Sequence, residues 1–426
     1  MSRPDATSAT PEPDAQSVTS PGQLRARLEA LSPADANYAT AFVDSLLSGG
    51  RAIGASDLHL HPGPDALAVR WRIDGVLQPG GRYPRELAPN IVARLKVLAE
   101  LLTYRTDSPQ EGRIRTAAEG VEMRVSTFPT LHGEQAVVRL FGSQQRLERL
   151  SELGLPDAVR EQLAALLHET SGAVLISGPA GSGKTTTAYA ALREIAAASG
   201  GGRSIATLED PVEVALANVS QSQVNMNAGF DLTSGLRFLL RQDPEVILVG
   251  EMRDRPTAEV ALQAALTGHL VLTTFHAGSA AGALSRLLDM GLEPYSLRSG
   301  ILAVISQRLV RRLCDCAVAA DPIDAEARLG LPVTSARLPK GCPQCAGSGY
   351  RGRLVLAEMC ALDGAELGQA ILDRRDARAL EQLATQHGLT TCWQRACEAV
   401  EAGWTSPAEV RRVLGFAHQA GSPSGQ

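Results

Sequence analysis

Long apolar runs are absent from this chain of 426 residues. No stretch of roughly 18 consecutive apolar residues occurs, which is about the least that a membrane-spanning helix needs. The N-terminus also lacks the basic segment followed by an apolar segment that marks a signal peptide. We therefore expect a cytoplasmic protein.

Aromatic residues and excess positive charge are also scarce. Aromatic side chains make up 4% of the sequence, and the formal net charge is -5. Proteins that hold single-stranded nucleic acid stack bases on aromatic side chains inside a basic groove. The composition therefore predicts no nucleic-acid partner.

Cysteines are few and odd in number, since the chain has seven. Disulfides are rare in a reducing compartment, where clustered cysteines more often hold a metal. Four of them cluster in the C-terminal half, which predicts a metal site rather than disulfides: Cys314, Cys316, Cys342 and Cys345.

The hydrophobic patterning predicts two folded regions. Apolar residues alternate between positions 56 and 77, which predicts strands, and a helix is expected at 91–102, so the first region is a small α+β domain. In the second region an apolar strand at 172–177 opens an alternation of helices and strands, which predicts a parallel sheet. The expected boundaries are 1–36 for a disordered or reduced N-terminal segment, 37–141 for the α+β domain, 142–152 for a linker, 153–310 for the parallel-sheet domain, 311–358 for a tetracysteine module, 359–415 for a helical region and 416–426 for a tail.

A glycine-rich segment after the apolar strand fits the P-loop pattern Gly-x4-Gly-Lys-Thr without a mismatch. Its glycines let backbone N–H groups surround phosphate oxygens, and the helix that follows adds its positive end. Lys184 is expected to bridge the β- and γ-phosphates, and Thr185 to ligate Mg²⁺. An ordinary glycine-rich turn is the alternative. The segment predicts an ATP-binding site at Gly178, Pro179, Ala180, Gly181, Ser182, Gly183, Lys184, Thr185 and Thr186.

Two further strands run out into carboxylates. Glu251 follows the apolar run at 246–249, and Gly250 stands where a Walker B Asp is usual, so Glu251 is expected to hold Mg²⁺ through water. Glu209, Asp210 and Glu213 follow another strand, and a general base must lie within reach of the attacking water. A surface Glu and a charged loop without a role are the alternatives.

Two histidines flank the strand expected at 270–274. His269 precedes it and His276 follows it. Sites in α/β sheets gather at strand ends, so both are candidates for sensing the γ-phosphate. The alternative is a pair of packed or surface histidines.

These segments, in this order, resemble the type II secretion ATPases and the type IV pilus assembly motors. The likeness rests on the P-loop and on residues 209–213, 237–245, 247–254 and 267–276. The first region matches at 56–62, 70–75, 109–113 and 124–127, and the C-terminal part at 341–345 and 349–353. The resemblance covers about residues 37–415. It implies an α/β protein with a RecA-like P-loop ATPase domain, preceded by a smaller α+β (PAS-like) domain and followed by a cysteine module and a helical tail.

The resemblance also implies roles for single residues. Glu213 matches the acid that polarises the attacking water, and Glu251 the Walker B glutamate that supports Mg²⁺. Four arginines match basic residues that approach the γ-phosphate or act at the subunit contact: Arg113 and Arg124 for the first role, Arg237 and Arg241 for the second.

The cysteine cluster matches a zinc site of the assembly branch of this family. That branch carries two Cys-x-x-Cys pairs around a tetrahedral Zn²⁺. Cys342 and Cys345 keep this spacing, whereas Cys314 and Cys316 are one residue closer together and form a more strained chelate. The resemblance implies Zn²⁺ at these four cysteines, and four reduced thiols are the alternative.

The family resemblance predicts the partners of the chain. Family members form hexameric rings at the inner membrane, so we expect a homo-hexamer that contacts the polytopic platform protein from the cytoplasmic side. A domain that docks on a bitopic membrane partner is absent or reduced to residues 1–36, which puts that partner in doubt.

The implied function is a cytoplasmic ATPase motor that drives pseudopilus assembly and protein export by a type II secretion system. Assembly of a type IV pilus or a DNA-uptake pseudopilus is the alternative within the family. A RecA-like nucleic-acid translocase would share the P-loop, but the composition disfavours it. A non-hydrolysing regulatory subunit is disfavoured by Lys184, Glu213 and Glu251.

Overall fold

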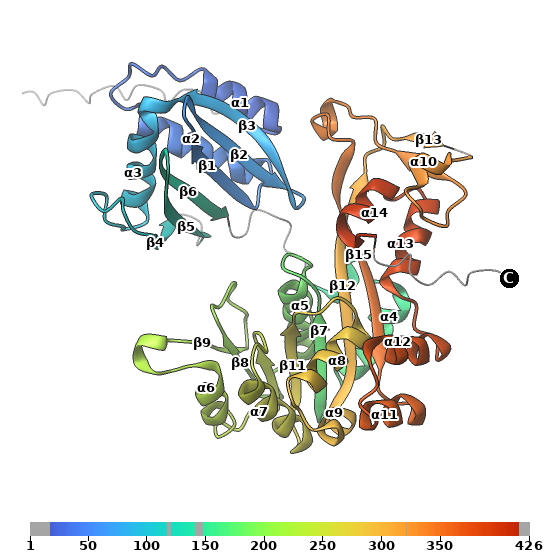
Figure 1. Cartoon of the computed structure of the whole chain (residues 1–426). Helices are drawn as coiled ribbons and strands as arrows, with labels where there is room; N and C mark the ends of the chain where they lie inside the picture. The colour runs from blue at the N-terminus through green and yellow to red at the C-terminus, as the bar shows by residue number, and fades with distance from the viewer. Residues whose placement is uncertain (1–17, 117–120, 141–147, 321, 417–426) are drawn as a thin grey trace, which may run out of the picture. The chain divides into compact units, whose positions relative to one another are not determined.

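The computed structural model describes residues 18–116, 121–140, 148–320 and 322–416. The chain divides into two compact units, residues 1–145 and 146–426, each with a core of its own (Figure 1). Residues 1–17 of the expected N-terminal segment, 142–147 of the expected linker and 417–426 of the expected tail lie outside the described residues.

The first unit is a six-stranded antiparallel sheet with its core on one face. The strand order is β3-β2-β1-β6-β5-β4. Successive side chains of a strand face opposite sides, so Leu58, Leu60 and Val69 enter the core while the residues between them face away. The elements are α2 (Tyr38–Ala52), β1 (Asp57–Pro62), β2 (Ala66–Ile73), β3 (Val76–Pro84), η1 (Arg85–Leu87), α3 (Ala88–Leu98), β4 (Gln110–Thr116), β5 (Val121–Thr130) and β6 (Gly133–Leu140).

Helix α1 (Pro21–Glu29) lies inside the range 1–36 that was expected to be disordered or reduced. Ser20 and Gln23 form a capping box, in which the Ser20 hydroxyl accepts the Gln23 N–H at 3.3 Å and the Gln23 side chain accepts the Ser20 N–H at 3.1 Å. Leu24 and Leu28 are buried in the core of the first unit. The folded part of this unit therefore begins well before residue 37.

The second unit is built on a seven-stranded mixed sheet in the order β15-β12-β7-β11-β10-β8-β9. Neighbouring strands are parallel except β12 and β15, which are antiparallel. Helices cover both faces of the central strands, which is why these strands form unbroken apolar runs in the sequence. The strands are β7 (Gly172–Ser177), β8 (Ile205–Glu209), β9 (Ser220–Gln223), β10 (Val246–Val249), β11 (Leu270–Phe275), β12 (Ile301–Leu313) and β15 (Tyr350–Ala361).

Two sets of helices form a core on either face of this sheet. Val174 and Ile176 of β7 share one core with α4 and α5, whereas Ala173 and Leu175 share the other with α6 to α9, α11 and α12. The helices are η2 (Leu150–Glu152), α4 (Asp157–Leu166), α5 (Lys184–Ala198), η3 (Met226–Ala228), α6 (Leu232–Leu239), α7 (Arg255–Leu266), α8 (Ala280–Asp289), α9 (Pro294–Gly300), α11 (Ala365–Leu372) and α12 (Ala377–Gln386).

Strands β12 and β15 run on from the sheet into a C-terminal subdomain, drawn in orange and red in Figure 1. Arg311 pairs with Arg353 across the two strands, so β12 continues through the expected boundary at 310/311. Val310 and Leu356 lie in a separate core there. The remaining elements are β13 (Val318–Ala320), α10 (Ala325–Arg328), β14 (Ala336–Leu338), η4 (Pro343–Cys345), α13 (Cys392–Glu401) and α14 (Pro407–Leu414).

Candidate nucleotide and metal sites

The predicted P-loop lies between buried β7 and α5, at the carboxyl edge of the parallel strands. Gly178 and Gly183 have φ angles of 148° and 90°, a region that favours glycine. A Cβ at position 178 would lie 2.5 Å from the Gln307 carbonyl oxygen, so space also demands glycine there. Helix α5 begins at Lys184 and directs its free N–H groups at the loop, as an anion site requires.

Lys184 is held inside its own loop. Its ammonium donates to the carbonyl oxygens of Gly178 at 2.9 Å and Pro179 at 3.0 Å. Burial lowers the pKa of Lys184, and the negative charges of Glu251 and Glu213 oppose that effect. A phosphate bound in the loop would offer this ammonium charged oxygens in place of neutral carbonyls. Thr185 follows half-buried in the first turn of α5, and Thr186 is exposed.

Gln307 of β12 fixes the backbone of the P-loop and the first turn of α5. This residue was not predicted from the sequence. Its amide N–H donates to the Ser182 carbonyl at 2.7 Å, and its amide oxygen accepts the Thr187 hydroxyl at 3.0 Å. The side chain is buried, so both contacts are shielded from water. Its two partners lie 120 and 125 residues away in the sequence, so no local pattern identifies Gln307.

Glu251 and His276 meet at the same edge of the sheet. His276 Nε2 lies 2.9 Å from Glu251 Oε1, and His276 Nδ1 lies 3.5 Å from Lys184 Nζ. One neutral tautomer, with its proton on Nε2, satisfies both contacts because it donates to the carboxylate and accepts from the ammonium. Arg253 binds the other Glu251 oxygen at 2.9 Å. The predicted residues Lys184, Glu251 and His276 therefore form one continuous polar chain.

His269 lies at the other edge of the sheet. Its carbonyl accepts the N–H of Gly172 at the start of β7, and its ring contacts the Ala264 carbonyl at 3.0 Å. Within this chain it is not brought to the P-loop, contrary to the expectation for two flanking histidines. The physical reason is that β11 separates the two, and only its carboxyl end faces the loop.

Glu209 is buried, and its carboxylate is taken up by hydrogen bonds from other side chains of the same unit. It is buried and accepts hydrogen bonds from the hydroxyls of Tyr189 and Thr207 and from Gln221. The same Tyr189 oxygen accepts the backbone N–H of Glu213 at 3.2 Å. Through Tyr189, Glu209 therefore fixes the backbone of the acidic segment 209–213.

Asp210 and Glu213 lie in the same segment with exposed side chains. Glu213 is close enough for its charge to act on Lys184. Of the three predicted acids, Glu213 is the one that combines exposure with this electrostatic proximity to the P-loop.

Arg237 and Arg241 lie on an exposed surface at the end of α6. Arg241 donates to the Arg237 carbonyl at 2.8 Å, and its guanidinium lies 5.7 Å from the ring centre of Phe238. Phe238 is 64% exposed, so an apolar ring and two cations are presented together.

Arg113 and Arg124 are direct partners in adjacent strands of the first unit. Arg139 pairs with Arg124 in the next strand, and Asp57 and Arg72 continue the same line. Directly opposed residues share a face of a sheet, so these five form one row on the face away from the core. Asp57 binds Arg72 at 3.3 Å and Arg139 at 3.1 Å. Arg113 and Arg124 were predicted from the sequence, whereas Arg139, Asp57 and Arg72 were not.

The four predicted cysteines come together in the C-terminal subdomain. Their sulfur atoms all lie within 4.8 Å of one another. The measured Sγ–Sγ separations are 3.8 Å for Cys314–Cys342, 3.9 Å for Cys316–Cys345 and 3.7 Å for Cys342–Cys345. A tetrahedral Zn²⁺ with bonds of about 2.3 Å requires sulfurs about 3.8 Å apart. The donor set therefore fits zinc, and the shorter Cys314–Cys316 spacing does not prevent it.

Backbone groups favour the thiolate form of Cys345, whereas burial raises the pKa of Cys316 to about 12. Burial opposes ionisation of Cys345, but its sulfur accepts the N–H groups of Cys342 at 3.1 Å and Gly349 at 3.2 Å. These donors hold the pKa of the Cys345 thiol at about 6, below its ordinary value. Thiolate is the form that binds metal.

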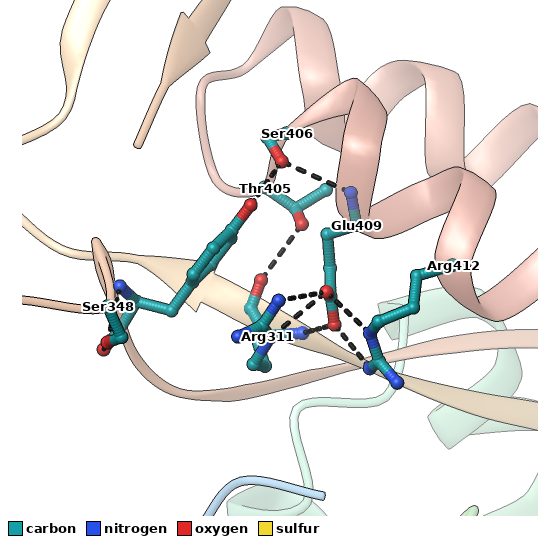
Figure 2. A network of polar contacts seen from close by, with 7 residues as sticks. Arg311, Ser348, Thr405, Ser406, Glu409 and Arg412 are labelled. Atoms are coloured by element: carbon teal, nitrogen blue, oxygen red, sulfur yellow. Dashed lines mark hydrogen bonds and ion pairs between the residues drawn. The ribbon is translucent and has the colours of Figure 1, made fainter. Parts of the chain in front are cut away.

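A polar network joins Arg311 of β12 to Glu409 and Arg412 of α14 (Figure 2). The Glu409 carboxylate, which is buried, lies between two guanidinium groups and contacts Arg311 at 2.7 Å and Arg412 at 2.6 Å. Tyr350 stacks on Arg311 at 3.9 Å, and its hydroxyl lies 2.6 Å from that of Ser406. Ser348 links this group to the Cys345 carbonyl at 2.7 Å.

Within the described ranges, every helix is too short or too polar to cross a bilayer.

Comparisons with known proteins agree with this arrangement. A family model described as "Type II/IV secretion system protein" matches residues 33–412. Type II secretion system protein E of Pectobacterium carotovorum subsp. carotovorum is 42% identical over 376 residues, which cover 87% of this chain and 74% of the relative. The type IV pilus assembly ATPase PilB of Thermus thermophilus is 38% identical over 386 residues, which cover 88% of this chain and 43% of the relative.

A solved structure is similar to this fold at low sequence identity. The X-ray structure of the Legionella pneumophila ATPase DotB aligns with a TM-score of 0.64 and 20% identity, over 90% of this chain and 97% of that one. The predicted α/β fold is confirmed.

Proposed function

Because this chain belongs to the type II/IV secretion system protein family, we propose that it hydrolyses ATP to drive pseudopilus assembly and protein export by a type II secretion system. The observation that carries the proposal is the polar chain from Lys184 through His276 to Glu251 at the P-loop. It gathers a phosphate-binding cation, a candidate γ-phosphate sensor and a metal-supporting carboxylate at one edge of the sheet.

The proposed division of labour follows from charge and exposure. The P-loop N–H groups and Lys184 hold the phosphates, while Thr185 and Glu251 hold Mg²⁺. When bound, Mg²⁺ supplies positive charge that neutralises the phosphate oxygens. Exposed Glu213 orients and deprotonates the attacking water. His276 fixes the position of the Glu251 carboxylate relative to the Lys184 ammonium.

Zn²⁺ is proposed as a structural metal held by Cys314, Cys316, Cys342 and Cys345. Four thiolates leave no open position on a tetrahedral zinc, so the site would stabilise the subdomain without taking part in hydrolysis. The sulfur separations near 3.8 Å support this assignment.

We propose that the active form is a homo-hexamer that works from the cytoplasm on a polytopic inner-membrane platform protein. A bitopic docking partner and nucleic acid are not part of the proposal. Exposed Arg237, Phe238 and Arg241 are suited to a subunit contact. The arginine row that contains Arg113 and Arg124 is suited to the negative charge of a γ-phosphate.

Type IV pilus or DNA-uptake pseudopilus assembly is the second candidate. The pilus assembly ATPase from Thermus supports it, but this chain spans 43% of that protein against 74% of the type II secretion relative. The higher identity to the type II secretion relative, 42% against 38%, favours the secretion system.

The test is phosphate release measured against protein concentration, with the oligomer followed by light scattering. Arginines supplied by another domain or subunit contribute about 10³ to 10⁵ in rate. The monomer should therefore be nearly inactive, and specific activity should rise as rings form. Arg113→Ala should lower turnover without unfolding the second unit. A fully active monomer would contradict the hexameric motor.

A further inference from the structure

Glu358 of β15 is a buried carboxylate that belongs to neither site described above. It lies opposite Ser306 of β12 and is 4% exposed. Burying a carboxylate is unfavourable unless its oxygens receive hydrogen bonds. Burial raises its pKa, and backbone N–H donors oppose that rise. The identity of those donors indicates what the residue does.

Each oxygen of Glu358 accepts the first N–H of a different helix. Oε1 accepts the N–H of Ala280, where α8 begins, and Oε2 that of Cys392, where α13 begins, each at 2.7 Å. Helix N-termini carry free N–H groups and partial positive charge, so a carboxylate is a suitable acceptor for both. One side chain thus joins two helices that are far apart in the sequence.

The α8 side of this junction leads directly to the nucleotide site. Only three residues separate Ala280 from His276, which contacts Glu251 and Lys184. The short segment is fixed at three points: Arg286 donates to the His276 carbonyl at 2.6 Å, Arg308 donates to the Gly278 carbonyl at 2.7 Å, and Glu358 accepts the Ala280 N–H. The position of His276 therefore depends on where Glu358 holds the start of α8.

The α13 side leads away from the nucleotide site. Helix α13 packs against β15 and shares its core with Val310, Leu356 and Val410 of α14. Through this core it belongs to the subdomain that also contains the cysteine cluster. A displacement of the His276 segment that moves Glu358 would also pull on the first turn of α13.

We propose that Glu358 is a positioning residue that couples the nucleotide site to the C-terminal helices. It does not touch the nucleotide. Its hydrogen bond with the Ala280 N–H fixes the position of the segment 276–280. Its hydrogen bond with the Cys392 N–H transmits a displacement of that segment to the start of α13. The inference rests on the proposed ATPase function and deepens it, because it names the route by which the nucleotide state reaches a second part of the chain.

The decisive variant is Glu358→Gln in the full chain. A glutamine amide offers one acceptor oxygen and one donor group, so one of the two helix N–H groups loses its acceptor and meets another donor. We expect kcat to fall on the order of tenfold, because a buried donor is left without a partner. KM for ATP should change less than about twofold, since the P-loop and Lys184 are untouched.

Hydrogen exchange distinguishes coupling from a purely structural role. In the wild-type chain, addition of Mg²⁺ and ADP should change protection both at the P-loop and in the first turn of α13. In Glu358→Gln the P-loop should still respond and α13 should not. Glu398→Gln, on an exposed position of the same helix, is the matched control and should behave as wild type.

Thr391→Ala provides a second route if Glu358→Gln does not fold. It removes the N-cap hydroxyl that accepts the Gln394 N–H at 3.2 Å, loosens the start of α13 and leaves Glu358 in place. It should weaken the response of α13 with unchanged KM. An unchanged kcat in Glu358→Gln, or an α13 response equal to wild type in either variant, would overturn the proposal. Because ADP binding is read directly, a chain that binds ADP but does not hydrolyse ATP would refute the proposed function and still test the coupling.

Discussion

His276 Nε2 lies 2.9 Å from Glu251 Oε1, at the point where two neighbouring parallel strands end. The same imidazole contacts Lys184 through Nδ1 at 3.5 Å, so one ring joins the carboxylate to the P-loop lysine. The contact fixes the position of the Glu251 carboxylate at the carboxyl edge of the sheet, beside the P-loop.

Glu251→Gln should weaken the support of Mg²⁺ more than the binding of nucleotide. The amide keeps the shape of the side chain but loses the charge that attracts a divalent cation. We expect the Mg²⁺ concentration for half-maximal phosphate release to rise and kcat to fall, while ADP still binds. Glu259→Gln, an exposed pair partner of Arg255 on α7, is the control. Unaltered magnesium dependence would show that Glu251 does not support the metal.

Gln307→Ala should make the P-loop less ordered, because it removes two buried hydrogen bonds that hold the loop and α5. It leaves the Ser182 carbonyl and the Thr187 hydroxyl without their buried partner, which costs about 1–3 kcal/mol. Denaturant unfolding should shift by that amount and KM for ATP should rise. The control Gln242→Ala removes an exposed amide after α6. If both variants match wild type, Gln307 has no part in shaping the loop.

The purified chain should contain about one Zn²⁺, bound by Cys314, Cys316, Cys342 and Cys345. Cys345→Ser should lose the metal, whereas Cys397→Ser, outside the cluster, should retain it. Elemental analysis of protein never exposed to a chelator measures this. Finding no metal in such protein would leave four reduced thiols as the correct description.

The Glu409 network should make the C-terminal subdomain sensitive to acid. Burial opposes ionisation, but hydrogen bonds from Arg412 and Arg311 lower the pKa of Glu409 below its ordinary value. A lowered folded pKa means that the stabilisation is present above the unfolded value, about 4.3, and is lost as pH falls through the folded pKa.

Thermal unfolding of the full chain between pH 7 and pH 2 measures this dependence, because the loss falls below the unfolded pKa. Glu409→Gln should be less stable at pH 7 and should lose less stability on acidification than wild type. Glu326→Gln, an exposed carboxyl of the same subdomain, is the control. Equal acid sensitivity of Glu409→Gln and wild type would contradict the assignment.

The central strands of the seven-stranded sheet, which are buried on both faces, could be predicted from the sequence. Strands β7 and β10 are covered on both faces, so they are unbroken apolar runs, and their observed bounds, Gly172–Ser177 and Val246–Val249, are the predicted ones. The end of β12 was not predictable in the same way, because Arg311 and Arg312 suggest a surface turn. Pairing with β15 extends the strand, and that partner lies far away in the sequence.

The candidate site was predictable where a motif fixes local geometry, and not where the partners are distant. The P-loop needs only its own glycines and the helix after it, so the pattern was sufficient. Gln307, Tyr189 and Arg139 act through residues from other strands and helices, and spacing along the chain carries no information about them. His269 and His276 flank opposite ends of one strand, and only His276 follows its carboxyl end, which is the edge where ligands bind in open α/β sheets.

The central claim is that ATP is bound and hydrolysed at the P-loop with Glu213 as the base. Steady-state phosphate release and nucleotide binding, measured together on Lys184→Ala and Glu213→Gln, test it most directly. Lys184→Ala should lose turnover and most ATP affinity, because it removes the cation on the phosphates. Glu213→Gln should still bind ATP, with hydrolysis reduced on the order of 10² to 10⁴-fold. Wild-type turnover in Lys184→Ala would contradict the account, and a loss of binding in Glu213→Gln in proportion to its rate would show that Glu213 is structural.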